Sequence, residues 1–181
     1  MADRETEAAD GLFADPPAPV ARDWFVLRTR SRQEKALAEE LRGLGIAHFL
    51  PLKQMVRFYG KRRARVQVPL FPGYLFLRGG VKAAYEAERT RRVVQIIEVS
   101  DQVRLHHELK NIALAIRQNV PMASYQYLKR GVRVEVRTGP LRGIRGLVVD
   151  RDQRDRLILN VETLGTAVSL EIDPSQVDLL D

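Results

Sequence analysis

The stretch from residue 131 to residue 181 holds five short β-prone runs at close spacing. They are 132–136, 146–150, 157–162, 167–172 and 177–179. In the first run Val132, Val134 and Val136 alternate with charged residues, so this strand is expected to bury one face. Strands this short, in a segment this small, can bury a core only by closing on themselves. We therefore expect a small five-stranded β-barrel over residues 130–181.

The segment 23–118 alternates strand-like and helix-like patterns. Apolar, β-prone runs occur at 24–29, 46–51, 66–76 and 93–99, and helical patterns at 31–44, 81–88 and 107–118. This order, β-α-β-β-α-β-α, is a split βαβ pattern in which an antiparallel sheet carries helices on one face. The predicted fold class is α+β, with an N-terminal domain over residues 23–118 and a linker over residues 119–129.

The first of these helices has recognisable ends. Ser31 and Glu34 fit a capping box, in which each residue bonds the backbone amide of the other. Gly45 stands where a left-handed C-terminal cap is expected. Between these ends an apolar stripe recurs at helical spacing, made of Leu37, Leu41 and Leu44.

Charge is unevenly distributed along the chain. Residues 1–21 carry one Arg against five acids, and residues 121–181 carry nine basic and nine acidic residues. Residues 22–120 carry twenty Lys and Arg against nine acids, a net charge of +11 that favours a polyanion such as nucleic acid as partner. The acidic, proline-containing start, residues 1–22, is predicted to be a disordered tail.

Residue usage excludes several classes of function. The sequence has no cysteine and three scattered histidines, which excludes disulfides, thiolate nucleophiles and the usual zinc sites. No side chain lies in a known nucleophile context, so we expect neither an enzyme nor a cofactor. No apolar run approaches the ~18 residues that span a bilayer, and the acidic start is unlike a secretory signal. We expect a cytoplasmic monomer that binds no metal and no membrane.

The stretch Pro-Leu-Phe-Pro-Gly-Tyr-Leu-Phe, residues 69–76, combines two prolines with three aromatic residues. Pro69 and Pro72 restrict their backbone φ angles, and Gly73, between Pro72 and Tyr74, permits a turn. Such a stretch is expected to present Phe71 and Tyr74 as rigid anchors, since little conformational entropy remains to be lost on binding. The alternative is that these aromatics, and Phe76 above all, belong to the core of the sheet.

Three segments of the N-terminal domain together resemble the NusG family of transcription elongation factors: Trp-Phe-Val-Leu at 24–27, Phe-Leu-Pro at 49–51, and residues 69–76. Residues 131–180, with the glycine-rich segment 139–146 at their centre, resemble the KOW domain, an SH3-like barrel that follows the N-terminal (NGN) domain in that family. The sequence of residues 69–76, together with the basic stretch before it, is most similar to that of the specialised RfaH-type and UpxY-type members.

The resemblance implies a factor that binds RNA polymerase, docks on the clamp helices of its β′ subunit, reaches its β subunit and suppresses pausing or termination. The docking surface of the family matches Trp24, Leu52, Leu70, Phe71, Pro72 and Tyr74. Positions that face non-template DNA in the transcription bubble match Arg30, Arg32 and Arg91. Gly60 makes the basic stretch 57–65 a hairpin tip or mobile loop, which should attract nucleic acid through Arg57, Lys61, Arg62, Arg63 and Arg65.

In the KOW domain, the resemblance places partner-binding loop positions at Ile144 and Leu164, where the family presents apolar residues to a small-subunit ribosomal protein or to Rho. Some relatives refold this domain into a helical hairpin. Here the alternating valines disfavour a helix, and each interior glycine would cost it about 1 kcal/mol. We therefore expect residues 131–181 to form a stable β-barrel in the free protein.

The main alternative is a ribosome-associated, KOW-containing RNA-binding protein. RNA binding favours aromatic residues interleaved with arginine on an open sheet face. The aromatics of residues 69–76 lie in a different part of the sequence from the arginines of residues 57–65, which are expected in a separate loop. This arrangement favours the transcription factor.

Overall fold

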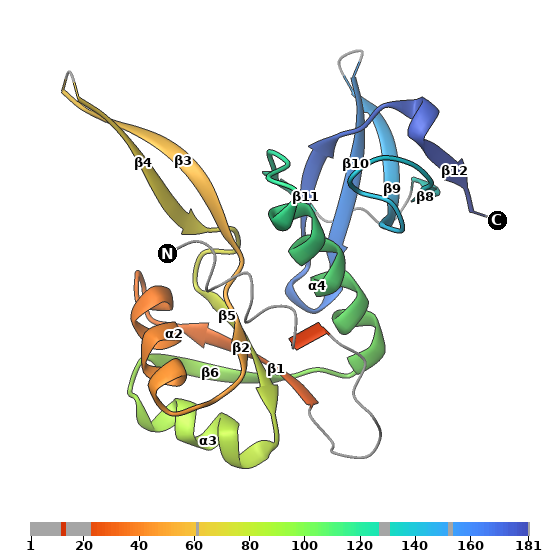
Figure 1. The fold of residues 1–181 in the computed structure, drawn as a ribbon. Helices are drawn as coiled ribbons and strands as arrows, with labels where there is room; N and C mark the ends of the chain where they lie inside the picture. The colour runs from red at the N-terminus through yellow and green to blue at the C-terminus, as the bar shows by residue number, and fades with distance from the viewer. Residues whose placement is uncertain (1–11, 14–22, 61, 127–130, 152–153, 181) are drawn as a thin grey trace. The chain divides into compact units, whose positions relative to one another are not determined.

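The computed structural model of the chain describes residues 12–13, 23–60, 62–126, 131–151 and 154–180. The chain divides into two compact units, Met1–Gln102 and Val103–Asp181 (Figure 1). We had expected the division to fall in a linker over residues 119–129. The structure instead assigns the helix that precedes this segment to the C-terminal unit.

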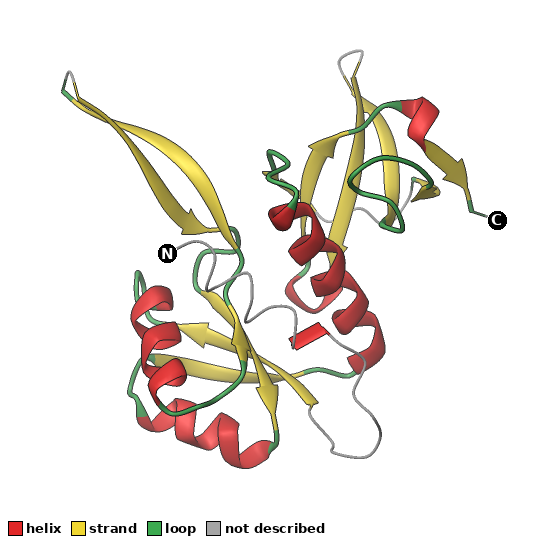
Figure 2. Cartoon of the chain, in the orientation of Figure 1, coloured by secondary structure: helices red, strands yellow, loops and turns green. Residues whose placement is uncertain are grey.

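The first unit is built on a four-stranded antiparallel sheet of order β2-β5-β1-β6. Its strands are β1 (Asp23–Thr29), β2 (His48–Phe49), β5 (Tyr74–Gly79) and β6 (Val93–Glu98). Helices α2 (Glu34–Gly43) and α3 (Val81–Arg89) pack on one face of the sheet (Figure 2). The predicted antiparallel sheet with helices on one face is confirmed.

Alternation along β1 and β5 separates the two faces of this sheet. Phe25 and Leu27 on β1 and Leu75 and Leu77 on β5 form a buried core with Leu37, Ala38, Leu41, Ala84 and Ala87 of the two helices. The intervening residues point to the opposite face. There the register pairs Val26 with Phe76, and Phe76 with Phe49 of β2, so this second face is apolar and rich in aromatic rings.

Helix α2 begins later than predicted, and the capping box is not formed. Gln33 is the N-cap residue and makes no side-chain capping bond, while Arg32 has a left-handed backbone with φ of 59°. Leu37 and Leu41 are fully buried, as predicted, but Leu44 is the C-cap residue and is exposed. Gly45 has the predicted positive φ, at 68°.

Between β2 and β5 the chain forms a long hairpin, β3 (Leu52–Tyr59) and β4 (Arg62–Pro69). Within the described residues it pairs with no other strand, and Figure 1 shows it projecting from the sheet of its unit. The hairpin tip expected at Gly60 is confirmed, but residues 57–59 and 62–65 are strand rather than loop, because the ladder continues to the pair Tyr59 and Arg62 beside the tip. At its base Lys35 Nζ of α2 donates a hydrogen bond to the carbonyl of Gln67 at 2.7 Å.

The second unit contains a six-stranded antiparallel sheet of order β12-β8-β9-β10-β11-β7. Its strands are β7 (Ala123–Gln126), β8 (Val132–Val136), β9 (Arg145–Arg151), β10 (Arg154–Val161), β11 (Thr166–Glu171) and β12 (Val177–Leu179). Short 3₁₀ turns, η1 (Glu162–Leu164) and η2 (Pro174–Gln176), connect the last strands. The five predicted strands, and the prediction of β rather than helical structure, are confirmed.

Two features of this sheet differ from the predicted barrel. Strand β7 lies within the predicted linker and pairs with β11, so part of that segment is a sheet strand. No strand pairing among the described residues joins β7 to β12, so the sheet is not closed. The pairing with β7 satisfies the backbone groups of β11 that closure would otherwise have engaged.

Helix α4 (Gln102–Arg117) is longer than the predicted helix over residues 107–118. The amide side chain of Gln102 bonds both backbone groups of Trp24, with 2.7 Å from Trp24 N to Oε1 and 3.0 Å from Nε2 to Trp24 O. Further along, Asn111 Nδ2 donates to the carbonyl of Arg145 at 3.2 Å, within the second unit. No helix of the described residues is long and apolar enough to cross a membrane.

Candidate functional site

The stretch 69–76 forms a tight turn between β4 and β5. The amide of Tyr74 donates to the carbonyl of Phe71 at 3.2 Å, with Pro72 and Gly73 as the central residues. Gly73 has φ of 84°, a conformation that glycine adopts without a steric cost. Its carbonyl accepts from the amide of Thr29 at 2.8 Å, and its amide donates to Glu34 Oε1 at 2.7 Å. The turn is therefore held from both β1 and α2.

Five aromatic rings form a chain of contacts that begins at this turn and extends along the sheet, and we call them the aromatic cluster: Phe13, Trp24, Phe49, Phe71 and Phe76. Phe71 meets Phe76 edge-on at 6.1 Å, and Phe76 lies 6.5 Å from Phe49. The guanidinium of Arg78 lies 5.5 Å from the centre of the Trp24 ring. Edge-on and stacked pairs of this kind add to the stability that area burial alone provides.

Phe13 was not predicted to contact anything, because residues 1–22 were expected to be disordered. Its ring stacks on Trp24 at 5.7 Å, with 26° between the ring planes, and meets Phe49 edge-on at 5.2 Å. Leu12 and Phe13 are both buried. The prediction of disorder was therefore wrong for these two residues, and the rest of that segment lies outside the described residues. The sequence signal that could have indicated this contact is the apolar pair Leu12 and Phe13 within an otherwise polar segment.

The predicted polymerase-binding residues divide by exposure. Pro72 is exposed, and Leu52 and Tyr74 are half-buried around the turn. Trp24, Leu70 and Phe71 are buried, with Phe71 only 4% exposed. The expectation that Phe71 would be presented as a free anchor was wrong, since it packs edge-on against the core ring of Phe76.

The β3–β4 hairpin carries the predicted basic cluster on a ribbon rather than on a loop. Arg57, Arg62, Arg63 and Arg65 are exposed, and Lys61 lies outside the described residues. In the register, Phe58 opposes Arg63 and Tyr59 opposes Arg62. Residues directly opposite each other share a face, so each face of the tip pairs one aromatic ring with one arginine.

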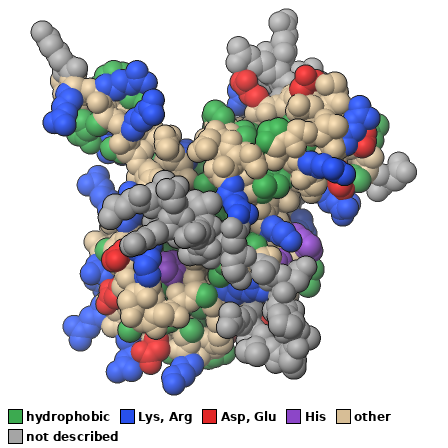
Figure 3. All heavy atoms as spheres, viewed as in Figure 1, with side chains coloured by type: hydrophobic (Ala, Val, Ile, Leu, Met, Phe, Trp, Pro, Cys, Tyr) green, Lys and Arg blue, Asp and Glu red, His purple; other side chains and the backbone are tan. Residues whose placement is uncertain are grey.

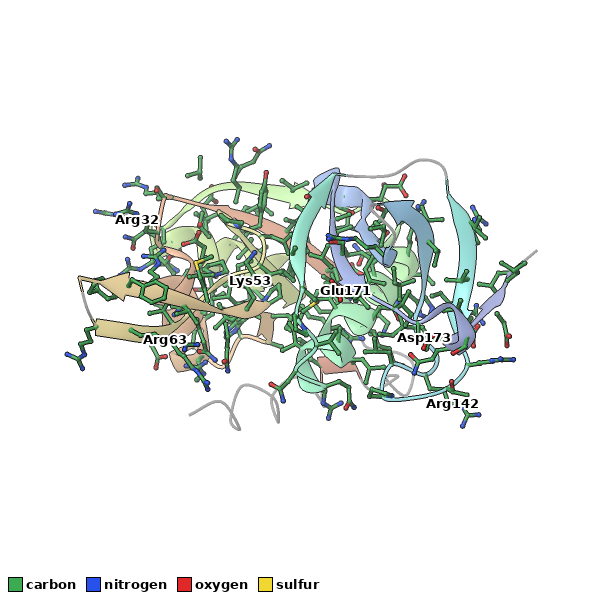
Figure 4. All side chains as sticks on the ribbon, turned by 90° about the horizontal axis from the view of Figure 1, so that it is seen from above. Arg32, Lys53, Arg63, Arg142, Glu171 and Asp173 are labelled. Atoms are coloured by element: carbon green, nitrogen blue, oxygen red, sulfur yellow. The ribbon has the colours of Figure 1, made fainter. Side chains whose placement is uncertain are left out.

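The aromatic rings at the hairpin tip are open to solvent. Phe58 is 73% and Tyr59 is 59% exposed. Behind them Val56 opposes Arg65, and Arg57 opposes Ala64. Figure 3 shows basic and hydrophobic side chains interleaved on this hairpin, and Figure 4 labels Lys53 on β3 and Arg63 on β4. Sequence reasoning found the arginines and missed Phe58 and Tyr59 as candidate contacts.

The three remaining arginines predicted to face nucleic acid come together at one end of the sheet. The amide of Arg30 donates to the carbonyl of Arg92 at 2.8 Å, which places the end of β1 beside the turn between α3 and β6. Arg32 and Arg91 flank this contact in sequence, and all three predicted arginines, Arg30, Arg32 and Arg91, are exposed. Arg32 and Arg91 both have left-handed backbones, with φ of 59° and 61°.

Arg92, which follows Arg91 in this turn, has a local structural role. Its Nε donates to Glu40 Oε2 at 2.8 Å, and its Nη1 donates to Gln33 Oε1. These bonds join the turn before β6 to both the N-cap and the exposed face of α2. They leave Arg91 as the arginine of this turn that extends into solvent.

In the second unit the two predicted partner-binding residues differ. Ile144 is fully buried, so its side chain belongs to the core rather than to a presented loop. Leu164 is half-buried in η1, beside Gly165 with φ of 60°. Of the two, only Leu164 offers apolar surface as the unit stands.

A polar cluster connects α4 to η1 in the second unit. The amide of Glu162 donates to Glu108 Oε2 at 3.2 Å, and Arg104 Nε lies 3.4 Å from Glu108 Oε1. Arg104 also pairs with the carboxylate of Glu162. Burial raises the pKa of Glu108 to about 7, and the bonds from Glu162 and Arg104 only partly offset that rise.

Among the described residues, no group of three or more His, Asp or Glu side chains is arranged to hold a metal ion. The features that the structure does bring together are an aromatic cluster that begins at the turn between β4 and β5, a ribbon of paired aromatics and arginines, and a group of exposed arginines. These are elements of binding surfaces.

Comparison with known proteins places these features in a family. The model of the family described as transcription termination factor nusG matches residues 22–119. A curated relative, the transcription termination/antitermination protein NusG of Borreliella burgdorferi, is 22% identical over 183 residues, covering 88% of this chain and 99% of the relative. A solved structure, the crystal structure of the MjSpt4:Spt5 complex in conformation B, covers 87% of this chain and 97% of its own at 18% identity, with a TM-score of 0.30.

Proposed function

The chain belongs to the NusG family of transcription elongation and termination factors, and we propose that it binds RNA polymerase through its first unit and suppresses pausing or termination. The observation that carries this proposal is the family match over residues 22–119, which includes the turn at residues 69–76 and four rings of the aromatic cluster. The sequence of the turn and of the basic stretch before it most resembles that of the specialised RfaH-type and UpxY-type members.

The proposed docking surface for the β′ clamp helices surrounds the turn. Pro72 and the half-buried Leu52 and Tyr74 provide its accessible part. Leu70 and Phe71 are buried next to these residues in sequence, and Trp24 lies farther along β1, opposite Arg78, where Phe13 stacks on its ring. Because interface energy concentrates in a few well-packed aromatic anchors, Tyr74 is the accessible residue expected to contribute most.

The mechanism is binding alone. A factor that bridges the β′ and β subunits opposes opening of the clamp, and it can do so only by binding the closed state more tightly than the open one. The open states precede pausing and termination, so this difference in affinity would favour continued elongation. No covalent bond is made or broken.

The basic surfaces of the first unit are proposed to contact the non-template DNA strand of the transcription bubble. Arginines supply salt-dependent attraction to phosphates, and exposed rings stack on unpaired bases. The pairs Phe58 with Arg63 and Tyr59 with Arg62 offer both on each face of the hairpin tip. Exposed Arg30, Arg32 and Arg91 offer a second set of phosphate contacts.

The second unit is proposed to recruit a further partner, a small-subunit ribosomal protein or Rho, through the apolar surface at Leu164. Ile144 would contribute only through the packing of the core beneath it, since it is fully buried.

One observation favours a second candidate, a ribosome-associated RNA-binding protein. The argument against RNA binding was that the arginines lay apart from aromatic side chains, but on the hairpin they alternate with Phe58 and Tyr59. Interleaved aromatics and arginines also suit single-stranded RNA.

A pull-down with the tagged full-length chain separates the two candidates. Co-purification of RNA polymerase, with no enrichment of ribosomes after nuclease treatment, would support the transcription factor. Co-purification of ribosomes without polymerase would favour the alternative.

A further inference from the structure

Leu12 and Phe13 lie on the aromatic face of the first unit, and we call these two residues the N-terminal cap. They are 6% and 7% exposed. The Phe13 ring contacts Trp24 and Phe49, at 5.7 Å and 5.2 Å between ring centres. The cap is thus seated on two strands of the sheet, β1 and β2.

The surface beneath the cap is the face of the sheet opposite the helices. Phe25 and Leu27 of β1 face α2 and α3, so Trp24 between Asp23 and Phe25 points to the other side. Phe49 pairs in register with Phe76, which places both rings on that side too. Trp24 is among the residues proposed to form the polymerase-docking surface. The cap therefore occupies apolar surface that a partner could use.

The cap is small compared with the surface that a protein partner would cover. Within the described residues, Leu12 and Phe13 belong to no strand ladder of the sheet. A standard protein interface buries about 800 Å² on each side, far more than two side chains can cover. A partner that docks on this face could therefore replace the contacts of the cap and bury additional surface area.

We propose that Leu12 and Phe13 form an intramolecular cap on the surface around Trp24 and Phe49, and that the polymerase partner must displace this cap in order to dock. The identity of the partner rests on the proposed function. The presence of the cap does not, because it follows from the ring contacts. Displacement lowers the apparent affinity for the partner, since only the uncapped fraction of the protein can bind.

The sequence provides a direct probe of the cap. Trp24 is the single tryptophan of the chain, so tryptophan fluorescence reports on this site alone. The experiment compares the full-length protein with Phe13→Ala, and measures quenching of Trp24 by acrylamide together with affinity for a β′ fragment that contains the clamp helices. Tyr85→Ala is the matched control, because it removes an exposed ring from α3. Phe13→Leu keeps an apolar side chain in the cap.

Phe13→Ala is expected to increase the quenching of Trp24 and to tighten binding of the β′ fragment roughly threefold to tenfold, the range that one aromatic pair contributes. Phe13→Leu should give intermediate values, and Tyr85→Ala should match the unmodified protein. Circular dichroism checks that each variant keeps its fold.

The remaining outcomes separate the cap from the proposed function. Unchanged quenching in Phe13→Ala would overturn the cap itself. Increased quenching with unchanged affinity for the fragment would overturn the competition. If quenching increases but neither protein binds the fragment, the cap is supported and the proposed function fails.

Discussion

The buried carboxylate of Glu34 accepts a hydrogen bond from the backbone amide of Gly73, at 2.7 Å between Oε1 and N. This bond ties the first turn of α2 to the turn between β4 and β5, the one proposed to present Tyr74 to the polymerase. Glu34 thus orients the docking surface although its sequence position suggested a role in capping its own helix.

Glu34→Ala is expected to destabilise the protein by roughly 1–3 kcal/mol, because the amide of Gly73 would lose a charged acceptor in a buried position. Glu39→Ala is the control, since Glu39 is exposed on the same helix and pairs with the neighbouring Arg42 in an exposed ion pair, worth about 0.5 kcal/mol or less. Urea unfolding measures both changes. Equal effects of the two substitutions would show that the bond to Gly73 contributes little.

Two groups of hairpin substitutions should affect nucleic-acid binding differently. Replacing Arg57, Lys61, Arg62, Arg63 and Arg65 with glutamine should weaken binding to single-stranded DNA and flatten its salt dependence, by up to ~0.7 in slope for each lost phosphate contact. Phe58→Ala with Tyr59→Ala should cost about 1–3 kcal/mol per stacked base and leave the slope nearly unchanged.

Fluorescence anisotropy over a series of salt concentrations measures both quantities. Neither group should alter sequence preference, because phosphate contacts and stacking do not identify bases. A loss of preference, or the same change of slope from both groups, would contradict this division of roles.

The two left-handed arginines predict a separation of stability from binding. A non-glycine residue with positive φ costs roughly 1–2 kcal/mol, and glycine removes that strain while losing more entropy on folding. Arg32→Gly and Arg91→Gly should therefore leave stability unchanged or raise it by up to about 1 kcal/mol, while weakening binding to single-stranded DNA. The control is Arg89→Gly, at the last residue of helix α3, where the backbone is right-handed and glycine relieves no strain, so stability should fall by up to about 1 kcal/mol rather than rise. A clear loss of stability in Arg32→Gly would refute the strain argument.

The raised pKa of Glu108 predicts a pH dependence in the second unit. Burial raises this pKa from 4.5 to about 7, so between these values the folded state binds a proton that the unfolded state releases. Stability should therefore decrease as pH rises through this window, by roughly 1–2 kcal/mol once the partial exposure of the side chain is taken into account.

Glu108→Gln should remove most of this dependence, and exposed Glu98→Gln should leave it intact. Amide hydrogen exchange in α4 and β10 at pH 5 and pH 7.5 would measure it. Greater protection at the higher pH in the unmodified protein would be the opposite of the expected result.

The sequence predicted those elements that have a buried side and a regular period. The strand at 132–136, with buried Val134 and Val136, and the helix stripe at Leu37 and Leu41 follow from alternation or helical spacing of apolar residues. The hairpin tip at Gly60 was one of the two expectations, but the length of the paired strands did not follow, because both faces of the hairpin are largely exposed and neither needs an apolar period. Its charged and aromatic residues therefore resembled a loop around Gly60.

Tertiary contacts decided the features of the site that were missed. The capping box failed because Arg32 has a positive φ and Glu34 bonds Gly73 instead of Ser31. The burial of Phe71 depends on its contact with Phe76. The contact of Phe13 with Trp24 joins a segment that was predicted to be disordered to the folded N-terminal domain. Local sequence patterns contain no information on such pairings.

Calorimetric titration of the full-length chain with the clamp-helix fragment of β′ tests the central claim most directly. The unmodified protein should bind the fragment, Tyr74→Ala should bind it at least about tenfold more weakly, as expected for a central aromatic anchor, and Tyr85→Ala should bind it like the unmodified protein. Failure of the unmodified protein to bind the fragment, or equal affinities for all three proteins, would contradict docking on RNA polymerase through this surface.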